Sequence, residues 1–174
     1  MAAADLSAIA CSDAVLGTQA GSEMEMIRKP KSPFVILLAE DEPADAHLVE
    51  LALAKNRVAA DLQHVLDGRE ALEYLRRQGQ RFANAVRPDL ILLDLNMPRM
   101  SGREFLAALK SDPALCAIPV VVLSTSAVDS DVRDSYRLGA AGYVTKPLDI
   151  KEFIVEIRQL SEYWLSLVSL PERR

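Results

Sequence analysis

From residue 34 onward, short runs rich in β-branched residues and leucine alternate with longer segments of helical period. Near-continuous apolar strands need cover on both faces, which parallel sheets obtain from the helices that connect their strands. The pattern therefore predicts an α/β domain with a doubly wound, five-stranded parallel (βα)₅ sheet. The expected strands are 34–39, 61–65, 90–94, 120–124 and 142–144, and the expected helices are 43–55, 68–78, 102–110, 129–138 and 149–167.

The chain outside this pattern is short. Residues 1–32 are rich in Ala, Ser and Gly and end close to two prolines, which favours a flexible N-terminal extension. Met24 and Met26 lie shortly before the predicted domain, so a start codon assigned too early is an alternative to a functional extension. We expect one folded domain over 33–168 and a C-terminal tail over 169–174.

The bulk composition excludes several classes of protein. The net charge is −5 and no run of Lys or Arg exceeds two, so we expect no nucleic-acid partner. The longest apolar runs reach six residues, far short of the roughly 20 that a membrane span needs. Cys11 and Cys116 are isolated, which is typical of a reducing compartment. The sequence thus predicts a soluble, cytoplasmic protein.

Three carboxylates fall at the carboxyl ends of two predicted strands: Glu40 and Asp41 after the first, and Asp94 at the end of the third. Ligands of doubly wound sheets bind outside these strand ends, so we expect the side chains to converge. Three like charges at close range repel one another unless a cation relieves them. Each acid alone is more simply a cap or turn residue, but together they predict a site for Mg²⁺ or Mn²⁺.

Complementary groups follow the other strands. Ser124 closes the fourth with a hydroxyl and Lys146 follows the fifth with an ammonium group, although each alone would be unremarkable. A carboxylate can attack phosphorus to form an acyl phosphate, and this transfer depends mainly on positioning and charge neutralisation. His47 and His64 are expected on the first helix and second strand, away from the site. The donor should therefore carry an activated phosphoryl group, such as a phosphohistidine.

Four blocks of the chain resemble, in order and spacing, the signature of bacterial response-regulator receivers. They are Glu40-Asp41, the stretch LDLNMPRMSG at 93–102, Ser124-Thr125, and GYVTKP at 142–147. The resemblance covers about 34–165. It implies a flavodoxin-like receiver fold with strand order 2-1-3-4-5. It also implies a phosphoacceptor signalling protein that catalyses only its own phosphorylation and slow autodephosphorylation.

The same resemblance implies roles for the acidic residues. Asp94 is the phosphorylation site and also contacts the metal. Asp41 is a direct metal ligand, Glu40 binds the metal through water, and the backbone carbonyl of Asn96 is a further contact. Glu40 departs from the commonest Asp-Asp form of the pair, and Glu is a familiar variant there.

Phosphoryl binding and switching are also implied by resemblance. Ser124, Thr125 and Lys146 bind the phosphoryl group, and Tyr143 swings inward when Ser124 moves toward it. Segments 38–46, 123–126 and 162–171 resemble the small response regulators partnered with bacterial phytochromes. The implied partner in a phosphorelay is a sensor histidine kinase, such as a bacteriophytochrome, or a histidine phosphotransfer protein.

The last predicted helix has an apolar stripe wider than one sheet face requires. Aromatic residues are favoured anchors at interfaces, so Tyr163 and Trp164 are candidates for a homodimer contact, with Trp164 exposed in a monomer. Folding of this stripe back onto the core is an alternative. No output domain is expected after about residue 165, so the signal would pass through protein contacts, through phosphate shuttling to a further histidine, or through competition as a phosphate sink.

Two other functions compete with the receiver. Phosphohydrolases of the aspartyl-phosphate type resemble this site, but they carry a second Asp two residues after the nucleophile, where this chain has Asn96. A phosphorylation-independent binding module would usually have lost the phosphoacceptor, the acidic pair or the lysine. All are retained here, which favours the phosphoacceptor.

Overall fold

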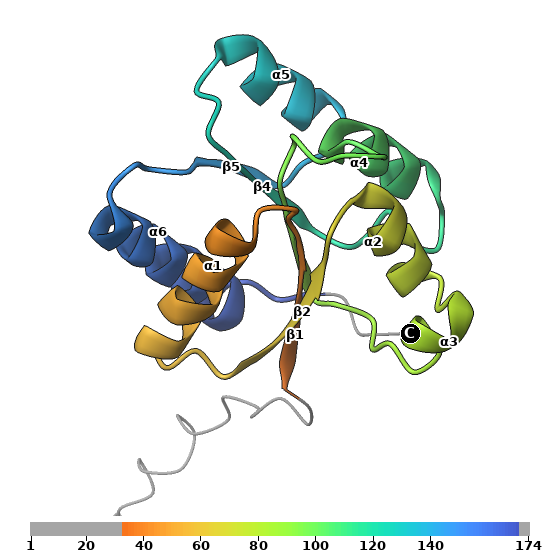
Figure 1. The fold of residues 1–174 in the computed structure, drawn as a ribbon, viewed down its shortest axis with the longest axis horizontal. Coiled ribbons are helices and arrows are strands. Elements are labelled where there is room, and N and C mark those ends of the chain that lie inside the picture. The colour runs from red at the N-terminus through yellow and green to blue at the C-terminus, as the bar shows by residue number, and fades with distance from the viewer. Residues whose placement is uncertain (1–32, 171–174) are drawn as a thin grey trace, which may run out of the picture. The chain divides into compact units, whose positions relative to one another are not determined.

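The computed structural model describes residues 33–170, so the predicted extension 1–32 and residues 171–174 of the predicted tail lie outside the described residues. The described chain contains one five-stranded parallel sheet in the order β2-β1-β3-β4-β5 (Figure 1). The predicted doubly wound fold and strand order are thereby confirmed. The strands are β1 (Phe34–Ala39), β2 (Ala60–Val65), β3 (Leu90–Leu93), β4 (Val120–Ser124) and β5 (Gly142–Thr145).

The helices agree with the predicted segments to within one residue except at two ends. The predicted helix 68–78 ends at Leu75, because Arg77 adopts a positive φ angle of 54° that the interior of a right-handed helix does not tolerate, and a separate short helix begins at Gly79. The last helix changes to a π-helical turn, η1 (Tyr163–Leu167). The helices are α1 (Pro43–Lys55), α2 (Gly68–Leu75), α3 (Gly79–Phe82), α4 (Gly102–Ser111), α5 (Asp129–Arg137) and α6 (Ile150–Glu162).

Side-chain caps fix where the helices that border the sheet edge begin. Asp67 accepts hydrogen bonds from two backbone amides of α2 at 2.7 and 2.9 Å, and Asp149 does the same for α6. Pro43 opens α1, where its missing N–H is not needed. Ser101 and Glu104 form a capping box at the start of α4. These caps and Pro43 thus define where the loops that follow β1, β2, β3 and β5 end.

Two apolar clusters cover opposite faces of the sheet, as the alternation of side chains along a strand requires. Leu37, Ile91 and Val122 point to one cluster with α2 and α4. Ile36, Leu90 and Val121 point to the other cluster with α1 and α6. Both faces of the sheet are therefore covered. A binding site is expected at the carboxyl ends of the strands instead.

Two further findings bear on the sequence expectations. Within residues 33–170, no helix combines the length and apolar character that crossing a membrane requires. Cys116 is a free, exposed thiol, and Cys11 lies outside the described residues.

Candidate functional site

The three predicted carboxylates converge at the carboxyl end of the sheet. β1 and β3 pair in parallel up to Ala39 and Leu93, and the Asp94 amide continues the pairing by donating to the Ala39 carbonyl at 2.9 Å. Glu40 and Asp41 therefore emerge beside Asp94. Each of the three offers a carboxylate oxygen, and these atoms all lie within 4.8 Å of one another.

The cluster is largely removed from solvent. Glu40 is 2% exposed and Asp94 is 6% exposed, while Asp41 is half-buried. Burial raises the pKa of Glu40 above its usual range and the charge of Asp94 adds to this, whereas the hydrogen bond and charge of Lys146 oppose it. The site thus concentrates negative charge where water can offset little of it.

Lys146 supplies the positive charge inside the cluster. Its Nζ lies 2.6 Å from Glu40 Oε2, 2.7 Å from Asp45 Oδ2 and 3.6 Å from Asp94 Oδ1, and its side chain is 8% exposed. Burial alone would lower the pKa of Lys146, but hydrogen bonds to Asp45 and Glu40 outweigh it and raise that pKa. The ammonium group therefore stays charged between three carboxylates.

Asp45 was not expected at this site. It lies in the first turn of α1, four residues after Asp41, so the first turn of the helix returns it to the strand ends. That spacing was the available signal in the sequence.

The fourth and fifth strands carry two further residues predicted for the site, Ser124 at the end of β4 and Tyr143 on β5. Ser124 is fully buried, and its Oγ accepts a hydrogen bond from the Ser126 amide at 3.2 Å, while Thr125 is exposed. Tyr143 is half-buried and donates its hydroxyl to the Ser126 carbonyl at 2.7 Å. The backbone of Ser126, in the loop after β4, is thus hydrogen-bonded to both Ser124 and Tyr143.

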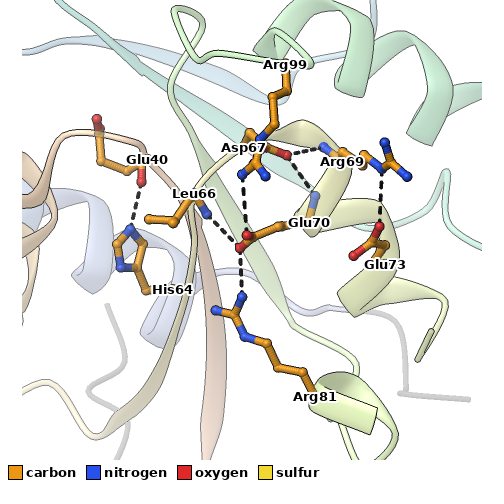
Figure 2. A network of polar contacts seen from close by, with 9 residues as sticks. All are labelled: Glu40, His64, Leu66, Asp67, Arg69, Glu70, Glu73, Arg81 and Arg99. Atoms are coloured by element: carbon orange, nitrogen blue, oxygen red, sulfur yellow. Dashed lines mark hydrogen bonds and ion pairs between the residues drawn. The ribbon is translucent and has the colours of Figure 1, made fainter. Parts of the chain in front are cut away.

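The loop after β3 presents its backbone to Asp94. The Asn96 amide donates to Asp94 Oδ2 at 3.0 Å, and the Asn96 side chain is exposed. Figure 2 shows how this loop is anchored: Arg99 forms an ion pair with the buried Asp67 and another with Glu70 at 3.4 Å. Glu70 also pairs with Arg81 at 3.1 Å. The loop is therefore tied to the start of α2.

His64 lies closer to the site than the sequence indicated. Its Nε2 is 2.8 Å from the backbone carbonyl of Glu40 (Figure 2). A carbonyl oxygen only accepts, so Nε2 must carry the proton in this contact. The expectation that His64 lies away from the strand ends is thereby corrected, because its ring reaches across from β2 to the residue after β1. His47 is exposed and pairs with Glu50 at 3.4 Å, so it takes no part.

The aromatic candidates for an interface, Tyr163 and Trp164, lie in η1, directly after α6 ends at Glu162. Tyr163 is 53% exposed, and its ring meets that of Trp164 edge to face at 5.4 Å. Trp164 is only partly exposed, since it packs against the cluster that holds α1 and α6. The apolar stripe of the last helix thus folds back onto the core in part.

The side chains at the strand ends fit a hard divalent cation. Carboxylate oxygens from Glu40, Asp41 and Asp94 are close enough to share one ion, and Lys146 alone cannot balance their charges. These three acids are the residues that would hold the ion, and the ion would neutralise their charges.

Comparisons with known proteins agree with this geometry. Residues 36–158 match the response regulator receiver domain. Response regulator Rcp1 of Synechocystis sp. is 43% identical over 80% of this chain and 94% of its own length. The Mn²⁺-bound crystal structure of Rcp1 superimposes with a TM-score of 0.75, covering 80% of this chain and 100% of that one.

A second solved structure is similar to the same extent. The phosphorylated cyanobacterial phytochrome response regulator RcpA is 47% identical, with a TM-score of 0.77 over 81% of this chain and 100% of its own. Sequence match, sheet order and the acidic edge all lead to one assignment. The chain belongs to the family of response regulator receiver domains.

Proposed function

We propose that the chain accepts a phosphoryl group on Asp94 from the phosphohistidine of a sensor histidine kinase. The observation that carries the proposal is the placement of Asp94 between an ammonium group and an acidic pair. Lys146 Nζ lies 3.6 Å from one oxygen of Asp94, and the Asn96 amide holds the other. A carboxylate fixed in this way is an oriented nucleophile with a cation beside it.

The chemistry follows from these contacts. An oxygen of Asp94 attacks phosphorus, the new O–P bond forms as the P–N bond to the donor imidazole breaks, and the electron pair leaves on that nitrogen. Lys146, whose Nζ lies 3.6 Å from Asp94, would bind the phosphoryl oxygens together with the hydroxyl of Ser124, which ends the neighbouring strand β4. Glu40, Asp41 and Asp94, with the backbone carbonyl of Asn96, would hold a Mg²⁺ ion, which when bound would supply charge neutralisation.

Hydrolysis of the acyl phosphate is expected to be slow. Asn96, two residues after the nucleophile, cannot serve as the acid or base that a turnover phosphatase needs. The protein then works as a signalling component, with Ser124 and Tyr143 carrying the change through the loop after β4.

The decisive experiment is phosphorylation of the protein in vitro. Incubation with Mg²⁺ and acetyl phosphate should add one phosphoryl group, seen by intact mass and Phos-tag electrophoresis, and Asp94→Asn should remove this gain entirely. Asp61→Asn, an exposed acid on β2, is the matched control and should behave as the wild type. Mg²⁺-dependent phosphorylation that persists in Asp94→Asn would refute the assignment of the acceptor.

The kinase partner is proposed to be a phytochrome. The support is 47% identity to RcpA, which is a cyanobacterial phytochrome response regulator. A histidine phosphotransfer protein presents the same phosphohistidine and is the alternative donor or acceptor. Replacing acetyl phosphate by a phosphorylated phytochrome kinase in the same assay tests this partner.

A homodimer through the end of the last helix is also proposed. Tyr163 and Leu167 are 53% and 77% exposed on η1, and a half-buried Trp164 supports the Tyr163 ring. The wild type should sediment as a dimer at tens of micromolar, and Tyr163→Ala should shift it toward monomer. Tyr136→Ala, which removes an equally exposed tyrosine from α5, is the control. A monomeric wild type would contradict the proposal.

A further inference from the structure

Lys146 is held by an anion outside the acidic cluster. Its Nζ lies 2.7 Å from Asp45 Oδ2, as close as the 2.6 Å contact with Glu40, whereas Asp94 is 3.6 Å away. Asp45 is not among the acids whose oxygens lie within 4.8 Å of one another. Its side chain is 32% exposed, against 2% for Glu40. Asp45 can therefore bind the ammonium group without serving as a ligand of the cation.

We propose that Asp45 is a positioning residue that holds Lys146 back from Asp94 in the unphosphorylated protein and competes with the phosphoryl group for it. The inference rests on the proposed function, because it concerns the lysine that binds the transferred group. Glu40 has its own role beside the cation, so Asp45 is the partner that stays available to Lys146 when the metal is bound.

Two consequences follow from charge. A divalent cation beside Lys146 is repelled by the ammonium group, and Asp45 screens that repulsion. Without Asp45 the site carries one more net positive charge, which disfavours Mg²⁺ and favours the phosphoryl dianion. Asp45 thus favours cation binding before phosphoryl transfer, and it must release Lys146 to the phosphoryl group during the transfer.

The test is Asp45→Asn, which keeps the shape of the side chain and removes its charge. Three quantities are measured: acylation of Lys146 by an amine-reactive ester in metal-free protein, read by peptide mass spectrometry; the Kd of Mg²⁺ by calorimetry; and the rate of phosphorylation by acetyl phosphate at saturating Mg²⁺. In Asp45→Asn each should rise by roughly threefold or more, since an adjacent charge at a partly exposed site has effects of this order.

Two variants separate this role from a structural one. Asp45→Glu should restore values close to the wild type, because its carboxylate can still reach Lys146. Glu50→Gln removes an equally charged, exposed side chain from the same helix and should change none of the three quantities. Circular dichroism confirms that each variant is folded.

The outcomes distinguish the inference from the function on which it rests. If the wild type is phosphorylated but Asp45→Asn matches it in labelling, Mg²⁺ affinity and rate, the role of Asp45 is overturned. If the wild type takes no phosphoryl group, the proposed function fails, and Lys146 labelling and Mg²⁺ affinity still decide whether Asp45 holds the lysine.

Discussion

Replacement of Gly102 with alanine should destabilise the protein by about 3 kcal/mol, because overpacking against rigid atoms in a buried site has penalties of this size. A Cβ at this position would lie 2.1 Å from the Asp94 carbonyl oxygen and 2.8 Å from Leu95 Cα. Both are main-chain atoms, so no side-chain rotation relieves the clash. The Gly102 amide also donates to the Leu95 carbonyl at 3.0 Å, so α4 cannot move away without losing this bond.

The same change should impair phosphorylation. Moving the main chain of Asp94 displaces the nucleophile relative to Lys146, and misplacement of about 1 Å can slow such a reaction by roughly tenfold or more. Urea denaturation gives the free energy of unfolding, and intact mass after incubation with acetyl phosphate gives the rate.

Gly142→Ala is the control for this prediction. A Cβ there would meet Val121 Cγ2 at 3.4 Å, which is ordinary contact with a side chain, so it should be tolerated. Equal stability of the two alanine variants would show that α4 can move away from Asp94 without penalty, and would remove the steric argument.

The sheet could be predicted because its signal is local. Alternation of apolar runs with helical periods gave the number and positions of all five strands. The end of α2 could not be predicted this way. Arg77 stops the helix by adopting a positive φ of 54°, and arginine carries no propensity for that conformation that would mark the position. The position at which such a helix ends is set by how the residues after it pack in the folded protein.

The residues of the site that directly follow a strand could be predicted from the sequence. Glu40, Asp41 and Asp94 follow adjacent parallel strands, so topology alone brings them together. His64 was missed because its contact with the Glu40 carbonyl depends on the register of β2 against β1, in which it pairs with Leu38. Register between parallel strands is set by the whole fold, and no residue near His64 signals it.

Lys146→Met tests the electrostatic balance of the site directly. Methionine keeps much of the apolar stem but leaves Glu40 and Asp94, which are 2% and 6% exposed, without the internal cation. Removing one partner of a buried ion pair typically costs about 3 kcal/mol, so metal-free Lys146→Met should be less stable by about that amount. Saturating Mg²⁺ should recover much of the loss, because the cation neutralises the same carboxylates, and it should therefore stabilise this variant more than the wild type.

Lys110→Met separates the loss of charge at the site from the loss of a partly buried lysine in general. Lys110 Nζ donates to the carbonyls of Cys116 and Ile118 at 2.9 and 2.8 Å and lies in the last turn of α4, whereas the first residue of that helix is the one that lies against Asp94. Its replacement should lower stability by the same amount with and without Mg²⁺. Urea denaturation of both variants in EDTA and in excess Mg²⁺ measures the difference. If Mg²⁺ stabilises Lys146→Met no more than Lys110→Met, Lys146 and the cation do not act on the same carboxylates, and the arrangement of charges proposed for phosphorylation at Asp94 is wrong.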